Sequence, residues 1–251
     1  MAKVNKLSRK TEIMAWTGPY SKSGRSALVP SGPWNYAMDA IAVHAIFEGV
    51  EDLLPEKMKS DGEGYVYFAD IISQSPNFPE LNFEAPGLVQ YREFAIFLKV
   101  EYRGKSYAYC PFMYVDNDVS LLRGFIAGFP KKLAVIDITR EHPLLDQRIF
   151  GGVAMRGGYG IAKVVVEPSE NADANPLDSF GSWILYRFAE PMGVREFVEI
   201  VPSISYARIE RGSGKLELYG GINDELPNVS KILGGYRFSA LLKIKEIKKL
   251  Q

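Results

Sequence analysis

Long runs of β-forming residues, separated by short turn signals, constrain the fold of this chain more than any other feature. Residues 93–102 and 106–115 are rich in aromatic and branched side chains and flank a glycine-centred turn at 103–105, which predicts a β-hairpin. Residues 65–72 form a further run of the same kind. Because strands do not alternate regularly with helices, the sequence predicts a mainly β (α+β) fold with a mainly antiparallel sheet.

Other patterns refine this outline. Glycines around 157–158 and 212–214 predict two more hairpins. Residues 48–54 have a helical pattern that Pro55 ends, and residues 119–126 predict one short helix. No repeat or shift in composition divides the chain. We therefore expect a basic N-terminal arm over residues 1–30, followed by a single domain over residues 31–251.

Composition excludes several classes of function. Thirty basic residues balance thirty acidic ones among 251, so nothing favours nucleic acid or an anionic membrane as a partner. The single cysteine, Cys110, predicts a reducing compartment and lies in an apolar run typical of a buried thiol. Neither a signal peptide nor a membrane span is evident, so we expect a cytoplasmic protein. His44 and His142 are too far apart in sequence to predict a metal site.

The pair Lys131-Lys132 has unusual surroundings. Apolar residues precede it at 126–130 and follow it at 133–136. In an extended segment the two side chains point to opposite faces, so at most one of them enters a pocket. Burial and the neighbouring charge would both lower the pKa of that amine from about 10.4 toward neutrality, which favours attack on a ketone. By themselves, these residues favour a solvated pair of lysines over a buried nucleophile.

Residues 114–118 (YVDND), a short helix, and residues 128–133 (GFPKKL) together resemble the central signature of the acetoacetate decarboxylase family. The resemblance extends loosely from Tyr36 to the C-terminus and implies a sheet closed into a barrel- or cone-like structure with a few short flanking helices. It also implies that Lys131 forms a Schiff base with the substrate, that Lys132 depresses the pKa of that amine, and that no cofactor is needed.

Further site residues follow from the same resemblance. The segment 90–93 (QYRE) matches the family pattern around an active-site glutamate, which makes Glu93 the candidate, although an exposed acid at the start of a strand would look the same. Tyr236 is a candidate acid or base near the last strand, or else a half-buried structural tyrosine. The residues expected to line a small apolar substrate pocket are Tyr36, Phe68 and Phe129.

The sequence also departs from the family. The arginine that binds the substrate carboxylate is missing from the region of Tyr36, and Ala69 occupies the position of a second acid. The segment before the lysines has Arg123-Gly124-Phe125 where the family has Gly-Arg-Glu. The lysine chemistry is therefore predicted more firmly than acetoacetate as the substrate.

These observations predict a carbon–carbon lyase that acts on a keto acid through an iminium on Lys131, followed by loss of CO2 or of a proton. One alternative is an aldolase-dehydratase that acts on pyruvate-type substrates. Another is a non-catalytic ligand-binding protein that keeps the fold. A small-molecule keto acid and further copies of the chain in a homo-oligomer are the expected partners.

Overall fold

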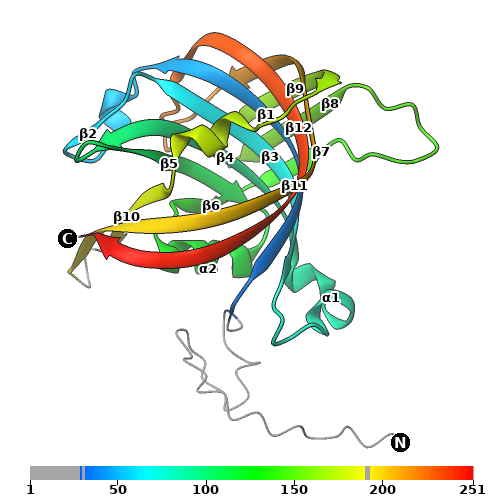
Figure 1. The fold of residues 1–251 in the computed structure, drawn as a ribbon, viewed down its shortest axis with the longest axis horizontal. Coiled ribbons are helices and arrows are strands. Elements are labelled where there is room, and N and C mark those ends of the chain that lie inside the picture. Colours follow the sequence, from blue (N-terminus) through cyan, green and yellow to red (C-terminus); the bar gives the residue numbers. More distant parts are fainter. Residues whose placement is uncertain (1–28, 30–31, 190–192, 251) are drawn as a thin grey trace, which may run out of the picture.

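The computed structural model describes residues 29, 32–189 and 193–250. Apart from Val29, the expected basic arm over residues 1–30 lies outside these described residues. The remainder consists of strands with a few short helices, and Figure 1 shows the strands curving around one another with helix α2 below them.

The strands are β1 (Asn35–Glu48), β2 (Met58–Lys59), β3 (Glu63–Gln74), β4 (Gln90–Tyr102), β5 (Lys105–Val115), β6 (Lys131–Leu133), β7 (Val135–Ile138), β8 (Phe150–Arg156), β9 (Tyr159–Asn171), β10 (Trp183–Ala189), β11 (Val194–Leu218) and β12 (Asn228–Leu250). The α-helices are α1 (Leu81–Glu84) and α2 (Asp118–Ala127), and short 3-10 helices cover Glu51–Leu53, Pro86–Leu88 and Pro176–Phe180.

One mixed sheet contains all 12 strands. Its main order is β10-β5-β4-β3-β1-β12-β11-β9-β8-β7, and β10 also pairs with β11, so the strands from β10 through β11 close into a ring. Pairing is antiparallel except where β5 runs parallel to β10 and to β6. The predicted mainly β (α+β) fold with a mainly antiparallel sheet is confirmed. The two parallel pairings of β5 were not predicted.

Two hydrophobic clusters lie on opposite faces of the strands. One takes inward residues from every strand of the ring, including Ala42, Tyr67, Ala95, Trp183 and Phe238, so it fills the inside of the ring. The other packs the opposite face of β1, β3, β4 and β5 against β7, β8 and β9. Because side chains alternate along a strand, a functional group on β3 or β4 belongs to one face or the other.

The predicted hairpins at 103–105 and 157–158 and the helix near 119–126 are present. The hairpin at 212–214 is wrong, because β11 runs without a turn through these residues. A Cβ at Gly212 would lie 2.0 Å from the carbonyl oxygen of Glu167, and one at Gly214 would lie 2.9 Å from Cα of Gly235. These glycines therefore allow neighbouring backbones to approach closely, and no turn needs them here.

The helix expected at 48–54 is also largely wrong. Strand β1 extends to Glu48, and only a 3-10 turn over Glu51–Leu53 follows. Residues 36–47 carry a nearly continuous apolar run because both faces of β1 are covered by the two clusters.

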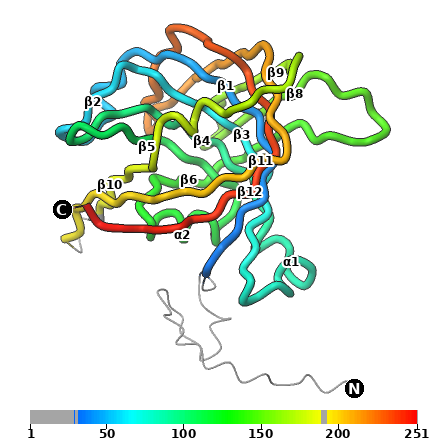
Figure 2. The backbone as a smooth tube through the Cα atoms, in the orientation of Figure 1, coloured from blue at the N-terminus to red at the C-terminus, as the bar shows by residue number. Residues whose placement is uncertain are grey.

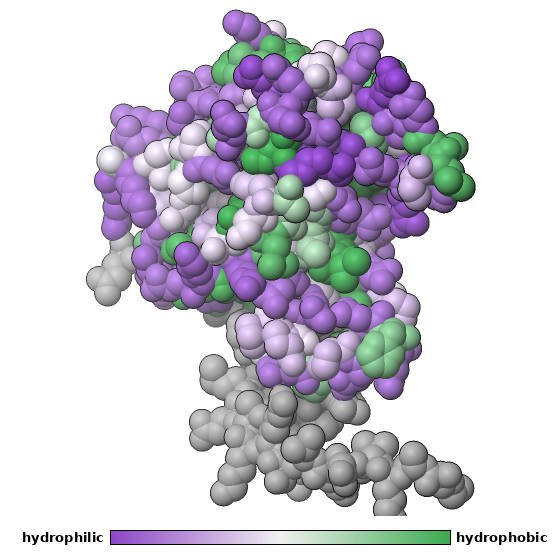
Figure 3. All heavy atoms as spheres, turned by 45° about the vertical axis from the view of Figure 1, so that its right-hand side comes forward, coloured by the Kyte–Doolittle hydropathy of each residue, from purple (hydrophilic) through white to green (hydrophobic). Residues whose placement is uncertain are grey.

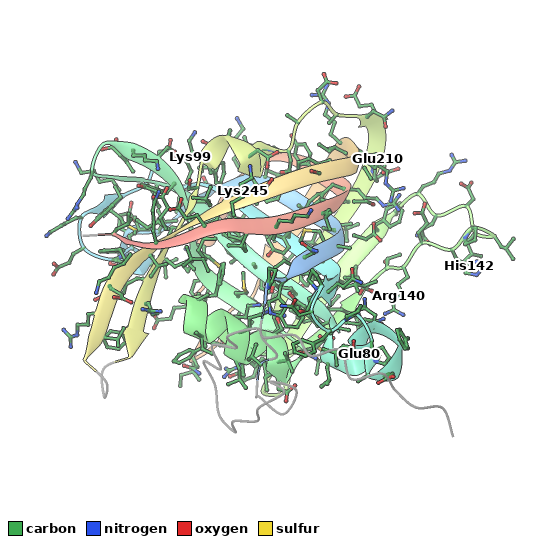
Figure 4. All side chains as sticks on the ribbon, turned by 60° about the horizontal axis from the view of Figure 1, so that its bottom comes forward. Glu80, Lys99, Arg140, His142, Glu210 and Lys245 are labelled. Atoms are coloured by element: carbon green, nitrogen blue, oxygen red, sulfur yellow. The ribbon has the colours of Figure 1, made fainter. Side chains whose placement is uncertain are left out.

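Hydrophilic residues cover most of the face in Figure 3, with smaller apolar areas between them. The loop between β7 and β8 extends away from the sheet, as the tube in Figure 2 and the labelled Arg140 and His142 in Figure 4 show. His142 is exposed, as expected for a polar turn. Among the described residues, every helix is too short or too polar to cross a membrane.

Candidate active site

Helix α2 and strand β6 set the position of the two lysines. Asn117 caps the helix, since its side-chain oxygen accepts a hydrogen bond from the backbone N–H of Ser120 at 2.8 Å. Gly128 ends the helix with a φ of 104°, a conformation that favours glycine. The chain then turns at Phe129 and Pro130 into β6, where Lys131 lies beside Met113 of β5.

Lys131 has an almost completely buried ammonium group. Its side chain is 6% exposed, and its Nζ lies 2.8 Å from Oε2 of Glu93 and 2.9 Å from Oγ of Ser120. Glu93 comes from β4 and its side chain is also 6% exposed. The two residues predicted from sequence as nucleophile and active-site acid are therefore in direct contact.

Gly124 lets the helix approach the lysine. A Cβ on Gly124 would lie 2.4 Å from both Cδ and Cε of Lys131, well inside any normal carbon–carbon contact. The stem of Lys131 consequently lies flat against the backbone of α2. This contact, together with Glu93 and Ser120, fixes the side chain along its whole length.

Glu93 has a second partner on its other oxygen. The hydroxyl of Tyr67 donates to Oε1 at 2.6 Å. Burial raises the pKa of Tyr67 well above its ordinary value, and the Glu93 carboxylate raises it further, so this hydroxyl remains a donor at any working pH.

Arg123 lies on the same turn of α2 as Gly124. Its guanidinium carbon is 4.6 Å from the ring centroid of Trp34, 5.0 Å from that of Tyr36 and 5.9 Å from that of Tyr91. It donates a long hydrogen bond of 3.4 Å to Oγ of Ser73 and another to Tyr91, and no carboxylate of the described chain lies within ion-pair distance.

Tyr91 links the two cations. The Nζ of Lys131 lies 5.5 Å from the centroid of the ring that Arg123 also approaches. Burial raises the pKa of Tyr91, and the Glu93 carboxylate adds to the rise. Burial likewise raises the pKa of Tyr36, while the nearby Arg123 opposes that change. Two neutral phenols therefore lie beside the two cations.

Residues 17–251 match the profile of the acetoacetate decarboxylase family. The chain belongs to this family. The resemblance carried by residues 114–118 and 128–133 is thereby confirmed. Comparison with curated proteins gives no match.

Solved structures of family-like enzymes share the fold. The enduracididine biosynthesis enzyme MppR with HEPES buffer bound is 25% identical with a TM-score of 0.84, and the match covers 94% of each chain. MppR complexed with pyruvate matches at 24% identity with a TM-score of 0.85, over 94% of this chain and 97% of that one. An acetoacetate decarboxylase-like enzyme from Sphingomonas wittichii RW1 matches at 23% identity with a TM-score of 0.82, covering 90% and 96% of the two chains.

Within this family signature, the second lysine points away from the first. Lys132 reaches Oδ1 of Asp224 at 2.6 Å, on the opposite face of β6. Tyr114 donates to the same carboxylate at 2.7 Å, and Arg156 approaches its other oxygen at 3.3 Å. Burial acts to raise the pKa of Asp224, but the hydrogen bonds from Lys132 and Tyr114 hold it below its ordinary value. The charge of Lys132 is thus largely neutralised at its own site.

The three predicted pocket residues divide between the two faces. Tyr36 lies beside Arg123, and Phe129 packs inside the ring against Trp183 at 6.0 Å between ring centroids. Phe68 follows Tyr67 on β3 and therefore points the other way, where it stacks on Phe94 at 4.7 Å. The structure does not bring Phe68 to the lysine, since alternation along β3 sends it into the outer core.

Tyr236 and Lys131 lie in the same row of paired residues across the sheet. The register of neighbouring strands aligns, in order, Tyr236, Ala42, Tyr67, Ala95, Met113 and Lys131. The ring of Tyr236 lies inside, 6.2 Å from that of Tyr65. Its predicted acid–base role stays a prediction, as does the modulating role of Lys132.

Sequence reasoning missed four residues around the lysine: Tyr67, Ser120, Arg123 and Gly124. The last three were recognisable in principle, because positions i, i+3 and i+4 of one helix share a face. Tyr67 depends on strand register, which the sequence does not specify. Among the described residues, no group of three or more His, Cys, Asp or Glu side chains could hold a metal ion.

Proposed function

We propose that this protein is a Schiff-base-forming lyase that acts on a small keto acid, with Lys131 as its nucleophile. The observation that carries the proposal is the buried contact between Lys131 and Glu93 beside an arginine without an acidic partner in the described chain. A lysine provides the amine, a carboxylate handles protons, and the guanidinium provides the charge that a substrate carboxylate needs.

Arg123 is the group we assign to the substrate carboxylate. The family's arginine is absent near Tyr36, yet Arg123 contacts the ring of Tyr36 from helix α2. The guanidinium and the amine of Lys131 both lie within 6 Å of the Tyr91 ring centroid, at 5.9 Å and 5.5 Å. A keto acid can therefore present its carboxylate to one cation and its ketone to the other.

The proposed reaction begins when Lys131 gives a proton to Glu93 and its neutral nitrogen attacks the ketone carbon. The carbonyl oxygen takes one proton from the attacking nitrogen and one back from Glu93 and leaves as water, which restores the Glu93 carboxylate. The resulting iminium withdraws electrons from the neighbouring bond. With a β-keto acid, the bond to the carboxylate breaks and CO2 leaves. With an α-keto acid, a proton leaves the adjacent carbon. Either step gives an enamine, which is reprotonated and hydrolysed to free the lysine.

A pyruvate-type substrate and aldol-dehydratase chemistry form the second candidate. MppR, the 25% identical relative, has also been solved as a complex with pyruvate. Ala69, where the family has a second acid, is compatible with either reaction.

Covalent trapping tests the proposal. Borohydride added with pyruvate or with acetoacetate should attach one reduced substrate to the chain, detected by intact mass and mapped to Lys131 by peptide sequencing. Lys131→Ala should abolish the adduct. Its neighbour Lys132→Met is the matched control and should still be labelled, because that side chain faces Asp224.

Acetone is a ketone without a carboxylate, so it can react with Lys131 but offers no carboxylate to Arg123. Arg123→Met should weaken trapping of pyruvate by about 10- to 100-fold, as expected for a lost charge-assisted hydrogen bond, and should leave trapping of acetone unchanged. Release of CO2 from acetoacetate would favour the decarboxylase. If the protein traps pyruvate but releases no CO2 from acetoacetate, aldol chemistry is favoured. An unlabelled wild-type protein across all three ketones would favour the non-catalytic binding protein.

A further inference from the structure

Glu93 is held by a different donor on each of its two oxygens. Lys131 approaches Oε2 at 2.8 Å, and the hydroxyl of Tyr67 donates to Oε1 at 2.6 Å. In the proposed reaction only the first of these donors changes. An ammonium carries three N–H groups, whereas the iminium that replaces it carries one. Tyr67 is therefore the donor that stays with Glu93 through every step.

The protein fixes Tyr67 in this position. The residue is 6% exposed, and its ring stacks on Phe97 with centroids 6.0 Å apart and planes 18° from parallel. Its partners across the two neighbouring strands are Ala42 and Ala95, both fully buried. Among the described residues, this hydroxyl donates to Glu93 and to no other acceptor.

We propose that Tyr67 is a positioning residue that keeps the Glu93 carboxylate aimed at the substrate carbon next to the iminium. This inference rests on the proposed function. In the step concerned, the C–H bond breaks, the proton goes to Glu93, and the electron pair forms the enamine double bond while the iminium nitrogen becomes neutral. The reverse step returns the proton. A hydrogen bond donated to a carboxylate favours its charged form, so a variant without this hydroxyl should lose that contribution.

Hydrogen exchange at the methyl group of pyruvate measures this step directly. In D2O the wild-type protein should replace the methyl protons of pyruvate with deuterium, followed by NMR across a series of pH values. The exchange rate should fall at low pH, and we call this fall the acidic limb of the rate profile. In Tyr67→Phe the acidic limb should shift to higher pH by about one to two units, which is the effect of removing one hydrogen bond to a charged group. The plateau rate at higher pH should stay within a few-fold of wild type, since phenylalanine keeps the stack on Phe97.

Tyr114→Phe is a matched control. It removes another buried hydroxyl that donates to a carboxylate, at 2.7 Å to Asp224 on the opposite face. Its acidic limb should not move. A second test combines Tyr67→Phe with Glu93→Gln. If Tyr67 acts through Glu93, the double variant should exchange at the same rate as Glu93→Gln alone.

The outcomes separate this inference from the proposed function. A wild-type protein that neither traps nor exchanges pyruvate overturns both. A wild-type protein that exchanges pyruvate, with a Tyr67→Phe variant that is slower at every pH but keeps the same acidic limb, overturns only the role of Tyr67. The role of Tyr67 is also overturned if Tyr67→Phe lowers the exchange rate further in the Glu93→Gln background.

Discussion

Replacing Gly124 with alanine adds one methyl group to helix α2 where the helix lies against the side chain of Lys131. The added carbon would lie 2.4 Å from Cδ and Cε of the lysine and 2.9 Å from Cγ. Non-bonded carbons prefer about 3.5–4.0 Å, so the lysine stem has to move by about 1 Å or more. Its ammonium, now 2.8 Å from Glu93 and 2.9 Å from Ser120, would then leave hydrogen-bonding range of at least one of them.

A displacement of this size has a large effect on chemistry and a small one on stability. Misplacing a reacting group by 1 Å costs about 100-fold in rate, which is the expected loss in the rate of pyruvate trapping. In the same helix, alanine is favoured over glycine by about 1 kcal/mol, which offsets part of the about 1–3 kcal/mol that overpacking costs. We expect the free energy of unfolding to fall by less than about 2 kcal/mol.

Time courses of borohydride trapping and urea unfolding of the same samples measure the two quantities. Gly87→Ala is the control, because a Cβ there would have no atom within 4 Å. Removing the Lys131 side chain tests whether the clash between it and the added methyl group is real. In a Lys131→Ala background, Gly124→Ala should stabilise the protein by up to about 1 kcal/mol. Trapping at the wild-type rate by Gly124→Ala would refute both the packing of Lys131 on α2 and the need for its fixed position.

Three further predictions concern the opposite face of the strands. Asp224→Ala should lower the free energy of unfolding by about 2–4 kcal/mol in urea titrations, less than for a fully buried pair because Lys132 and Arg156 are each 29% exposed. Since the pKa of Asp224 lies below its ordinary value, its stabilisation is complete above about pH 4 and is lost as the pH falls further, so Asp224→Asn should flatten the acid side of the stability curve. Phe68→Ala should cost about 3–5 kcal/mol, yet the folded variant should trap pyruvate at the wild-type rate, and a selective loss of trapping would restore Phe68 to the pocket.

The sequence was most informative where one local rule decides the structure. Glycine-centred turns located the hairpins at 103–105 and 157–158, and alternation along a strand predicted that Lys131 and Lys132 would point to opposite faces. The failure at 212–214 has a physical reason. Glycine allows both a tight turn and the close approach of two backbones, and only the tertiary structure tells these uses apart.

The contact between Lys131 and Glu93 depends on long-range register, and Glu93 was predicted only through the family resemblance. Glu93 pairs with Val115 of β5, whereas β6 reaches β5 from the other side at Met113. A bulge between Ile96 and Leu98 shifts the pairing of β4 with β5 farther along these strands. One residue of slip in β4 would turn Glu93 away from the lysine, and neither β-propensity nor hydrophobic pattern specifies that register.

Helix α2 joins the proposed carboxylate anchor and the nucleophile in one rigid unit. Arg123 and Gly124 are adjacent, so the residue proposed to face the substrate carboxylate and the residue against which Lys131 packs cannot move independently. Asn117 fixes the start of the helix, since it accepts from Ser120 and donates to the carbonyl oxygen of Gly87 at 2.7 Å. An arginine on β1 would instead be tied to the sheet. Placing it on α2 makes the distance between the proposed anchor and the amine depend on the packing of a single helix. In the proposed function, that distance would select between a carboxylate next to the ketone and one a carbon farther away.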